Sequence, residues 1–110
     1  MRPIRDGDRR DELASAALGQ SWMRQAPVSL VIGAIYQRTT GKYGERGRRY
    51  VHMEVGHAAQ NVYLQAAALT LGTTIVGAFQ DDKLKSVMGL PDSVEPLAIL
   101  PIGHPSDGYR

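Results

Sequence analysis

Residues 50–71 read YVHMEVGHAAQNVYLQAAALTL, and this stretch decides the fold. Apolar side chains recur along it at steps of three and four, and alanine and leucine, both strong helix formers, are abundant. The recurring positions are Val51, Val55, Ala58, Val62, Ala66 and Leu69. Ala59, Tyr63 and Ala67 add apolar surface on other faces, which predicts a long helix that packs on two sides, as a central helix or one shared across a dimer. We expect Gly72 to end this helix as its C-terminal cap.

The segments on either side of this helix predict strands and shorter helices. Upstream, residues 9–20 have helical spacing, with Asp8 or Asp11 placed to cap the first turn and an end near Gly19. Residues 28–35, VSLVIGAI, are typical of a strand buried on both faces. Downstream, residues 73–79 and 95–102 predict two strands, and a helix over residues 81–88, capped by Gly89, lies between them. This order predicts an α+β fold with one layered sheet, in a single domain over residues 1–110.

Residues 39–47, TTGKYGERG, are polar and rich in glycine, and they show no apolar periodicity. We expect a loop there, and loops held by a rigid scaffold often carry chemistry. Lys42 and Tyr43 are neighbours in this segment, and an amine beside a phenol can pass a proton to or from a bound substrate. From composition alone, an exposed lysine and a packing tyrosine explain the pair better.

The composition is that of a globular protein, with 43% apolar and 22% charged residues. The chain has no cysteine, which excludes disulfides, thiolate metal sites and a cysteine nucleophile. No stretch approaches the roughly 18–20 apolar residues that a membrane span needs, so we expect a cytoplasmic protein without membrane contact. Arginine and lysine cluster near the N-terminus and over residues 38–49, but a formal charge of only +2 argues against nucleic acid as a partner.

Motifs for several other chemistries fail on spacing. The glycines at Gly41, Gly44 and Gly47 match neither a P-loop nor a dinucleotide fingerprint. Glu54 and His57 have the Glu-x-x-His spacing of di-iron bundles, but such sites need a second copy of the motif and further carboxylates. No serine lies in a Gly-x-Ser-x-Gly turn. We therefore expect neither a metal site nor a serine hydrolase.

Four segments follow one another in an informative order. They are residues 38–50, RTTGKYGERGRRY; residues 54–66, EVGHAAQNVYLQA; residues 75–81, IVGAFQD; and residues 100–105, LPIGHP. In order and spacing they resemble the SagB-type dehydrogenases, azoline oxidase-like members of the nitroreductase superfamily. The resemblance covers about residues 8–105 and corresponds to the C-terminal half of a nitroreductase-like domain.

This resemblance implies a nitroreductase-like fold, here partial, in an intertwined homodimer with FMN at the subunit interface. It implies a flavoprotein that oxidises thiazolines and oxazolines on peptides, or reduces nitro compounds and quinones. By similarity, the backbone of Val76, Gly77 and Ala78 approaches the flavin ring near its N5 atom, where a glycine lets the main chain come close. Lys42 and Tyr43 match the pair implicated in catalysis in the azoline oxidases, and one of them would handle the proton while the flavin accepts hydride.

The chain departs from this family at the flavin phosphate. Family proteins carry an N-terminal Arg-Arg-Ser motif that grips the phosphate, and residues 9–11, RRD, resemble it only superficially. Arg110 is the other candidate for a phosphate contact. Two functions stay open. One is an FMN-dependent oxidoreductase, or a subunit of one that a complementary N-terminal half or its own copy completes. The other is a non-catalytic, flavin-free remnant that acts as a dimerisation or interaction module.

Overall fold

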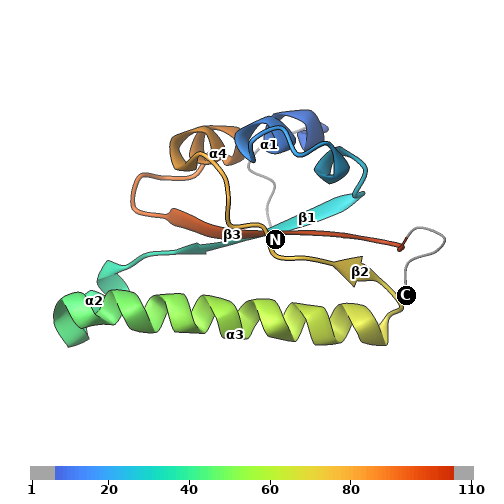
Figure 1. The fold of residues 1–110 in the computed structure, drawn as a ribbon. Helices are drawn as coiled ribbons and strands as arrows, with labels where there is room; N and C mark the ends of the chain where they lie inside the picture. Colours follow the sequence, from blue (N-terminus) through green and yellow to red (C-terminus); the bar gives the residue numbers. More distant parts are fainter. Residues whose placement is uncertain (1–6, 106–110) are drawn as a thin grey trace.

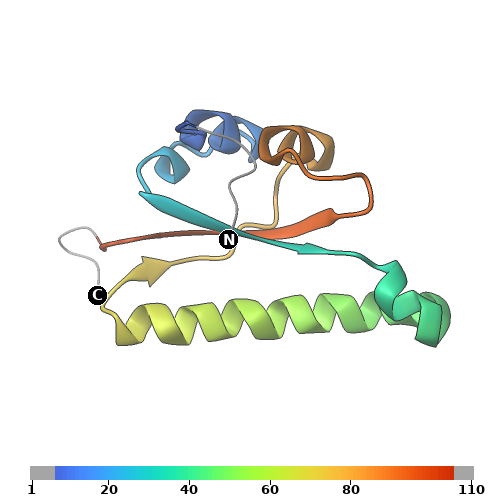
Figure 2. The same cartoon turned by 180° about the vertical axis from the view of Figure 1, so that it is seen from behind.

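The computed structural model describes residues 7–105 and has three layers. Helices α1 and α4 cover one face of a small sheet, and the long helix α3 runs along the other face (Figures 1 and 2). This arrangement confirms the expected α+β fold with one layered sheet and a long helix. The elements are α1 (Arg10–Ala16), a 3-10 turn η1 (Ser21–Arg24), β1 (Val28–Ala34), α2 (Gln37–Tyr43), a 3-10 turn η2 (Gly44–Arg46), α3 (Gly47–Ala68), β2 (Gly72–Thr73), α4 (Asp81–Met88) and β3 (Glu95–Gly103).

The sheet has the strand order β1-β3-β2, and both pairings are antiparallel. Val28 of β1 lies opposite Ile102 of β3, and the register shifts between Ile32 and Gly33, where β3 contributes one extra residue. The expected strand over residues 73–79 is only partly formed. Its paired residues are Gly72–Thr73, followed by one isolated bridge from Val76 to Ile99.

The core lies between the sheet and the α1–α4 layer. Its fully buried residues include Met23, Leu84 and Ile99, and small alanines of α1 let that helix approach closely. The prediction that β1 is buried on both faces is wrong for this chain, because Val28 is 53% and Leu30 is 42% exposed. The reason is that β1 is an edge strand, and α3 makes its sheet contacts with β2 and β3.

The long helix α3 confirms the helix predicted from residues 50–71, although it begins earlier and ends at Ala68. Gly72 is not its cap. Thr70 takes the left-handed conformation, with φ 62°, and the Leu71 N–H donates to the Ala66 carbonyl at 2.8 Å. The buried residues of α3 are Gly47, Val51, Ala59 and Ala66, so within this single chain one side of the helix is packed. Packing on the second side, as in a helix shared across a dimer, stays a prediction.

The glycine-rich segment over residues 39–47 is helical, and the predicted loop is wrong. Residues Gln37–Tyr43 form α2, and Gly44, with φ 67°, ends it. Tertiary contact stabilises this helix against its weak sequence signal. At Gly47 the absence of a side chain lets α3 approach α2 closely, since a Cβ atom there would lie 3.1 Å from the backbone of Thr39 and Thr40.

The short helices agree better with the sequence. Helix α4 spans the predicted residues, and Gly89 ends it with φ 66° while the Leu90 N–H donates to the Lys85 carbonyl at 3.0 Å. Helix α1 forms where expected but ends at Ala16, and a turn that includes Gly19 follows. Among the helices of residues 7–105, none is both long and apolar enough to cross a membrane.

Candidate functional site

Lys42 and Tyr43 occupy the last turn of α2, at the junction with α3. The Lys42 ammonium lies 5.2 Å from the centre of the Tyr43 ring, within the range of a cation–π contact. Tyr43 meets Tyr50 of α3 edge to face at 5.3 Å, and Tyr50 accepts a 3.1 Å hydrogen bond from Arg46. Because these contacts fix the Tyr43 ring while half of it stays exposed, its phenol is held in place and is accessible.

Tyr43 also lines a hollow of about 770 Å³ between β1 and the α2–α3 hairpin. Most of its wall is apolar, and Arg38 and Glu54 supply its charged groups. The remaining lining residues are Ile32, Gly33, Ala34, Ile35, Thr39, Tyr50, Val51, Val55 and Ala58. This mixture of an apolar wall with a few polar groups is typical of a small-molecule site.

The segment Val76–Ala78 combines an anchored residue with an open backbone. Val76 is 5% exposed, and its N–H and carbonyl both pair with Ile99, at 2.7 and 3.0 Å. Gly77 and Ala78 are exposed, and a Cβ atom built at Gly77 would have no neighbour within 4 Å. Among the described residues, no protein acceptor is bonded to the Gly77 and Ala78 N–H groups. The segment therefore presents two free backbone donors beside one position, Gly77, that has no side chain.

The chain does not bring these two groups into one hollow. The hollow that Tyr43 lines includes neither Lys42 nor residues 76–78. Helix α2 adjoins the N-terminal end of α3, whereas residues 74–80 leave β2 at the opposite end and rise towards α4 (Figure 1). A site that uses both therefore needs more than one copy of this chain or an additional segment.

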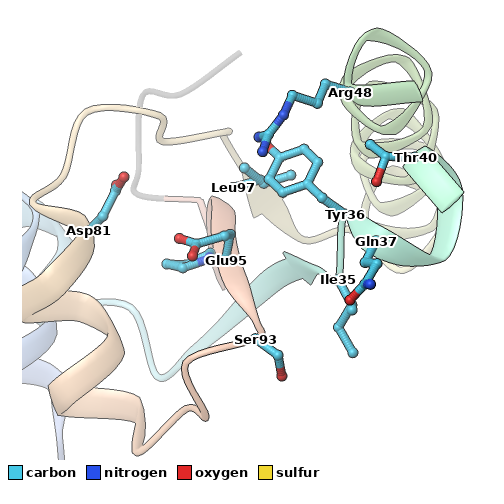
Figure 3. A pocket seen from close by; sticks show the side chains of 10 residues that line it. Ile35, Tyr36, Gln37, Thr40, Arg48, Asp81, Ser93, Glu95 and Leu97 are labelled. Carbon is cyan, nitrogen blue, oxygen red and sulfur yellow. The ribbon is translucent and has the colours of Figure 1, made fainter. Parts of the chain in front are cut away.

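A further hollow, of about 510 Å³, was missed by the sequence reasoning (Figure 3). Tyr36 lines it beside Arg48 and shares a 2.6 Å hydrogen bond with His52 Nε2. The guanidinium of Arg48 sits 4.5 Å from the centre of the Tyr36 ring. Asp81 and Glu95 face the same space from the opposite side (Figure 3).

Charged groups of both signs shift the pKa of the Tyr36 phenol. Burial is the main cause that raises the pKa of the Tyr36 phenol, and the nearby carboxylates of Glu95 and Asp81 raise it further. The Arg48 guanidinium acts in the opposite direction and lowers this pKa. Positive and negative groups therefore converge on one phenol.

The sequence carries no signal for this hollow when residues 39–47 are predicted to form a loop. Tyr36 and His52 are 16 residues apart, and only the tight α2–α3 hairpin brings them together. Asp81 and Glu95 come from two further elements, and their position depends on the sheet pairing. A helix prediction over residues 37–43 would have exposed the tyrosine–histidine pair.

The basic residues considered for a phosphate are neutralised or lie outside the described residues. Arg9 pairs with Glu12 at 3.1 Å, and Arg10 pairs with Asp8 at 2.7 Å. Arg110 lies outside residues 7–105. Within that range there is no group of three or more histidine, aspartate or glutamate side chains that could hold a metal ion.

Comparison with known proteins places these features in context. The chain is 53% identical over 93 residues to a protein of Methanocaldococcus jannaschii named as a nitroreductase, a match that covers 84% of this chain and 46% of that protein. It is 30% identical over 120 residues to an FMN reductase [NAD(P)H] of Bacillus subtilis, covering 94% of this chain and 47% of the reductase. The chain thus spans about half the length of the curated relatives it matches.

A solved structure agrees with the fold. A chain of the Escherichia coli microcin synthetase McbBCD complex, with truncated pro-MccB17 bound, superimposes with a TM-score of 0.84 and 26% identity. The superposition covers 96% of this chain and 40% of that one. The sequence model of the nitroreductase family matches residues 2–104, and the protein belongs to that family, with a nitroreductase-like α+β fold.

Proposed function

We propose that this chain contributes the ring-binding and proton-handling part of an FMN-dependent oxidoreductase. The observation that carries the proposal is the backbone at Gly77 and Ala78, which is open, anchored by Val76 and rich in free donors. The FMN reductase relative and the family membership support a flavin as the ligand.

Each group has a chemical task in this proposal. The Gly77 and Ala78 N–H groups donate to acceptor atoms on the ring edge, and the missing Cβ of Gly77 lets the ring approach. Bound FMN supplies hydride acceptance and donation. Lys42 and Tyr43 hold and transfer the accompanying proton at Nζ and at the phenol oxygen, and the Tyr50 contact keeps the phenol in place.

Within the family we propose a SagB-type dehydrogenase that acts on azoline-like rings of a peptide or on a small molecule. The support is the Lys42–Tyr43 pair in its sequence context and the structural similarity to a chain of the microcin synthetase complex. The chain then corresponds to the C-terminal half of the family domain and works in the cytoplasm.

The site is completed by a second copy of the chain or by a complementary N-terminal half. Lys42 and the 76–78 segment are not brought together within one chain, and the open side of α3 carries exposed Met53 and Leu64. A partner that packs on this side of α3 would cover both side chains. An intertwined homodimer places two copies of α3 where each covers the other.

The second candidate is a flavin-free dimerisation module. The exposed apolar residues of α3 favour it as much as they favour an enzyme, because a dimer core needs no cofactor. The two functions differ in whether the backbone at Gly77 binds a flavin.

Flavin titration separates the two candidates. The purified chain is titrated with FMN, alone and mixed with the N-terminal half of the Methanocaldococcus jannaschii relative, and the flavin absorbance and fluorescence are followed. Gly77→Val should weaken FMN binding by on the order of tenfold or more, because a side chain then occupies the ring edge. Gly56→Ala is the matched control, since a Cβ there also meets nothing within 4 Å.

If wild-type chain and mixture both fail to bind FMN while the chain forms a stable dimer, the dimerisation module is the better description. If Gly77→Val binds FMN as wild type does, the ring edge lies elsewhere.

The proton-handling pair has its own test. Lys42→Ala and Tyr43→Phe should lower turnover and leave FMN bound, because neither side chain is assigned to the flavin. Parallel loss of flavin and activity in these variants would show that the pair is structural.

A further inference from the structure

The hollow around Tyr36 is lined by groups of opposite charge, and some of their hydrogen-bonding atoms have no partner among the described residues. Arg48 lies on one wall, and Asp81 and Glu95 lie on the other (Figure 3). No ion pair joins Arg48 to either carboxylate within the described residues. Arg48 pairs with Glu45 at 3.2 Å and Glu95 pairs with Lys85 at 3.0 Å. What remains open to a ligand is the two terminal nitrogens of Arg48, Oε2 of Glu95 and the Asp81 carboxylate.

The contacts that hold Arg48 leave its two terminal guanidinium nitrogens free. Its Nε donates to Glu45 Oε2 at 3.2 Å, and its guanidinium stacks on the Tyr36 ring. The ring is fixed in turn, since the phenol bonds His52 at 2.6 Å and the two rings meet edge to face. No acceptor among the described residues is bonded to the two terminal nitrogens of Arg48. A planar pair of donors fixed in this way suits a carboxylate.

The opposite wall offers acceptors. Glu95 uses Oε1 to bind Lys85 Nζ at 3.0 Å, and Lys85 also donates to the Asp92 carbonyl, so Glu95 is oriented and its Oε2 stays free. In the described part of the chain, the Asp81 carboxylate accepts no hydrogen bond. Figure 3 shows Asp81 and Glu95 across the hollow from Tyr36 and Arg48. Two such groups suit an ammonium.

The volume and lining limit the ligand further. About 510 Å³ of space is available, and Ile35 and Leu97 add apolar surface to its lining. A purely anionic ligand would meet the two carboxylates, and a purely cationic one would meet Arg48. Only a ligand with both charges satisfies both walls.

We propose that this hollow binds the carboxylate and ammonium groups of a zwitterionic amino acid or short peptide. The carboxylate faces Arg48, the ammonium faces Asp81 and Glu95, and an aliphatic part lies against Ile35 and Leu97. The inference rests on these residues and does not depend on flavin binding.

Isothermal titration calorimetry on the intact chain tests the inference without flavin. The probes are leucine, dileucine and trileucine, each also with the amino group acetylated and with the carboxyl group amidated. The free zwitterions should bind, and either blocking group should weaken binding by on the order of tenfold, because each removes one charged contact. The probe that binds most tightly shows whether the ligand is a free amino acid or a short peptide.

Variants locate the site. Arg48→Gln and Asp81→Asn should each weaken binding of the zwitterion about tenfold. Arg49→Gln and Asp82→Asn are the matched controls, since these neighbours do not line the hollow, and they should bind as wild type does. Circular dichroism shows whether each variant is folded, and Asp81→Asn changes an exposed side chain without a protein partner, so it remains informative if Arg48→Gln unfolds.

The inference is overturned if no zwitterion binds at millimolar concentration, if blocked and free ligands bind equally, or if the controls lose binding as the variants do. Failure of this test leaves FMN titration unaffected, and failure of the Gly77 test leaves this one unaffected.

Discussion

Replacing Leu84 with alanine should remove a large part of the stability of this chain. Leu84 is fully buried in the core cluster, with Val76 and Ile99 in the same cluster. Its truncation deletes three buried carbons, worth about 0.8 kcal/mol each or roughly 2.4 kcal/mol together. The cavity left between α4 and the sheet brings the expected cost to roughly 2–5 kcal/mol. A chain of 110 residues has a total unfolding free energy of about 5–15 kcal/mol, so the loss is substantial.

The measurement is urea unfolding followed by circular dichroism, at a concentration where sedimentation shows a monomer. A thermal scan followed by the same signal should show the melting temperature falling by on the order of 10–30 °C. Leu64→Ala is the matched control, because Leu64 is 61% exposed on α3 and should cost less than about 0.5 kcal/mol. A loss below about 1 kcal/mol for Leu84→Ala would refute the core assignment. Equal losses for both variants would contradict the exposed position of Leu64 in the single chain.

Three further outcomes are expected. Gly89→Ala should cost about 1 kcal/mol in unfolding free energy, because alanine resists the left-handed conformation that ends α4. Burial raises the pKa of Tyr36 above its ordinary value of about 10, so the folded protein holds this proton more tightly. The resulting stability is complete below about pH 10 and is lost as pH rises through the folded-state pKa, and alkaline denaturation should be flatter for Tyr36→Phe. The Arg10 side chain lowers the pKa of Asp8 to about 2, and carboxyl NMR should show a return towards about 3.9 in Arg10→Gln.

The sequence predicted those elements whose apolar pattern is dense. Local periodicity predicts helices α3 and α4, and apolar β-branched runs predict strands β1 and β3. The two helices end at residues in the left-handed conformation, Thr70 and Gly89. Helix α2 did not follow, because Gly41 lies inside it and Gly44 ends it, and glycine lowers helix propensity. Contacts from α3 supply what the local sequence lacks, through the close approach at Gly47.

The candidate site divides in the same way. Lys42, Tyr43 and Gly77 came from resemblance, because no periodicity marks them. The hollow around Tyr36 depends on residues from α3, α4 and β3 that only the tertiary fold assembles. From the sequence, charged residues of this kind are predicted only to lie on the solvent-exposed surface. Their pairing across different elements leaves no local sequence pattern.

The strand order has a consequence for biosynthesis. The central strand β3 is the last of the three to be made, and both β1 and β2 depend on it for pairing. On the ribosome, α3 can form from contacts within its own segment while β1, with its β-branched side chains, has no partner until residues near Gly103 have emerged. Between the synthesis of Ala34 and that of Gly103 the nascent chain therefore carries an unpaired β-branched strand, and β1 is a segment that a chaperone could protect during that interval.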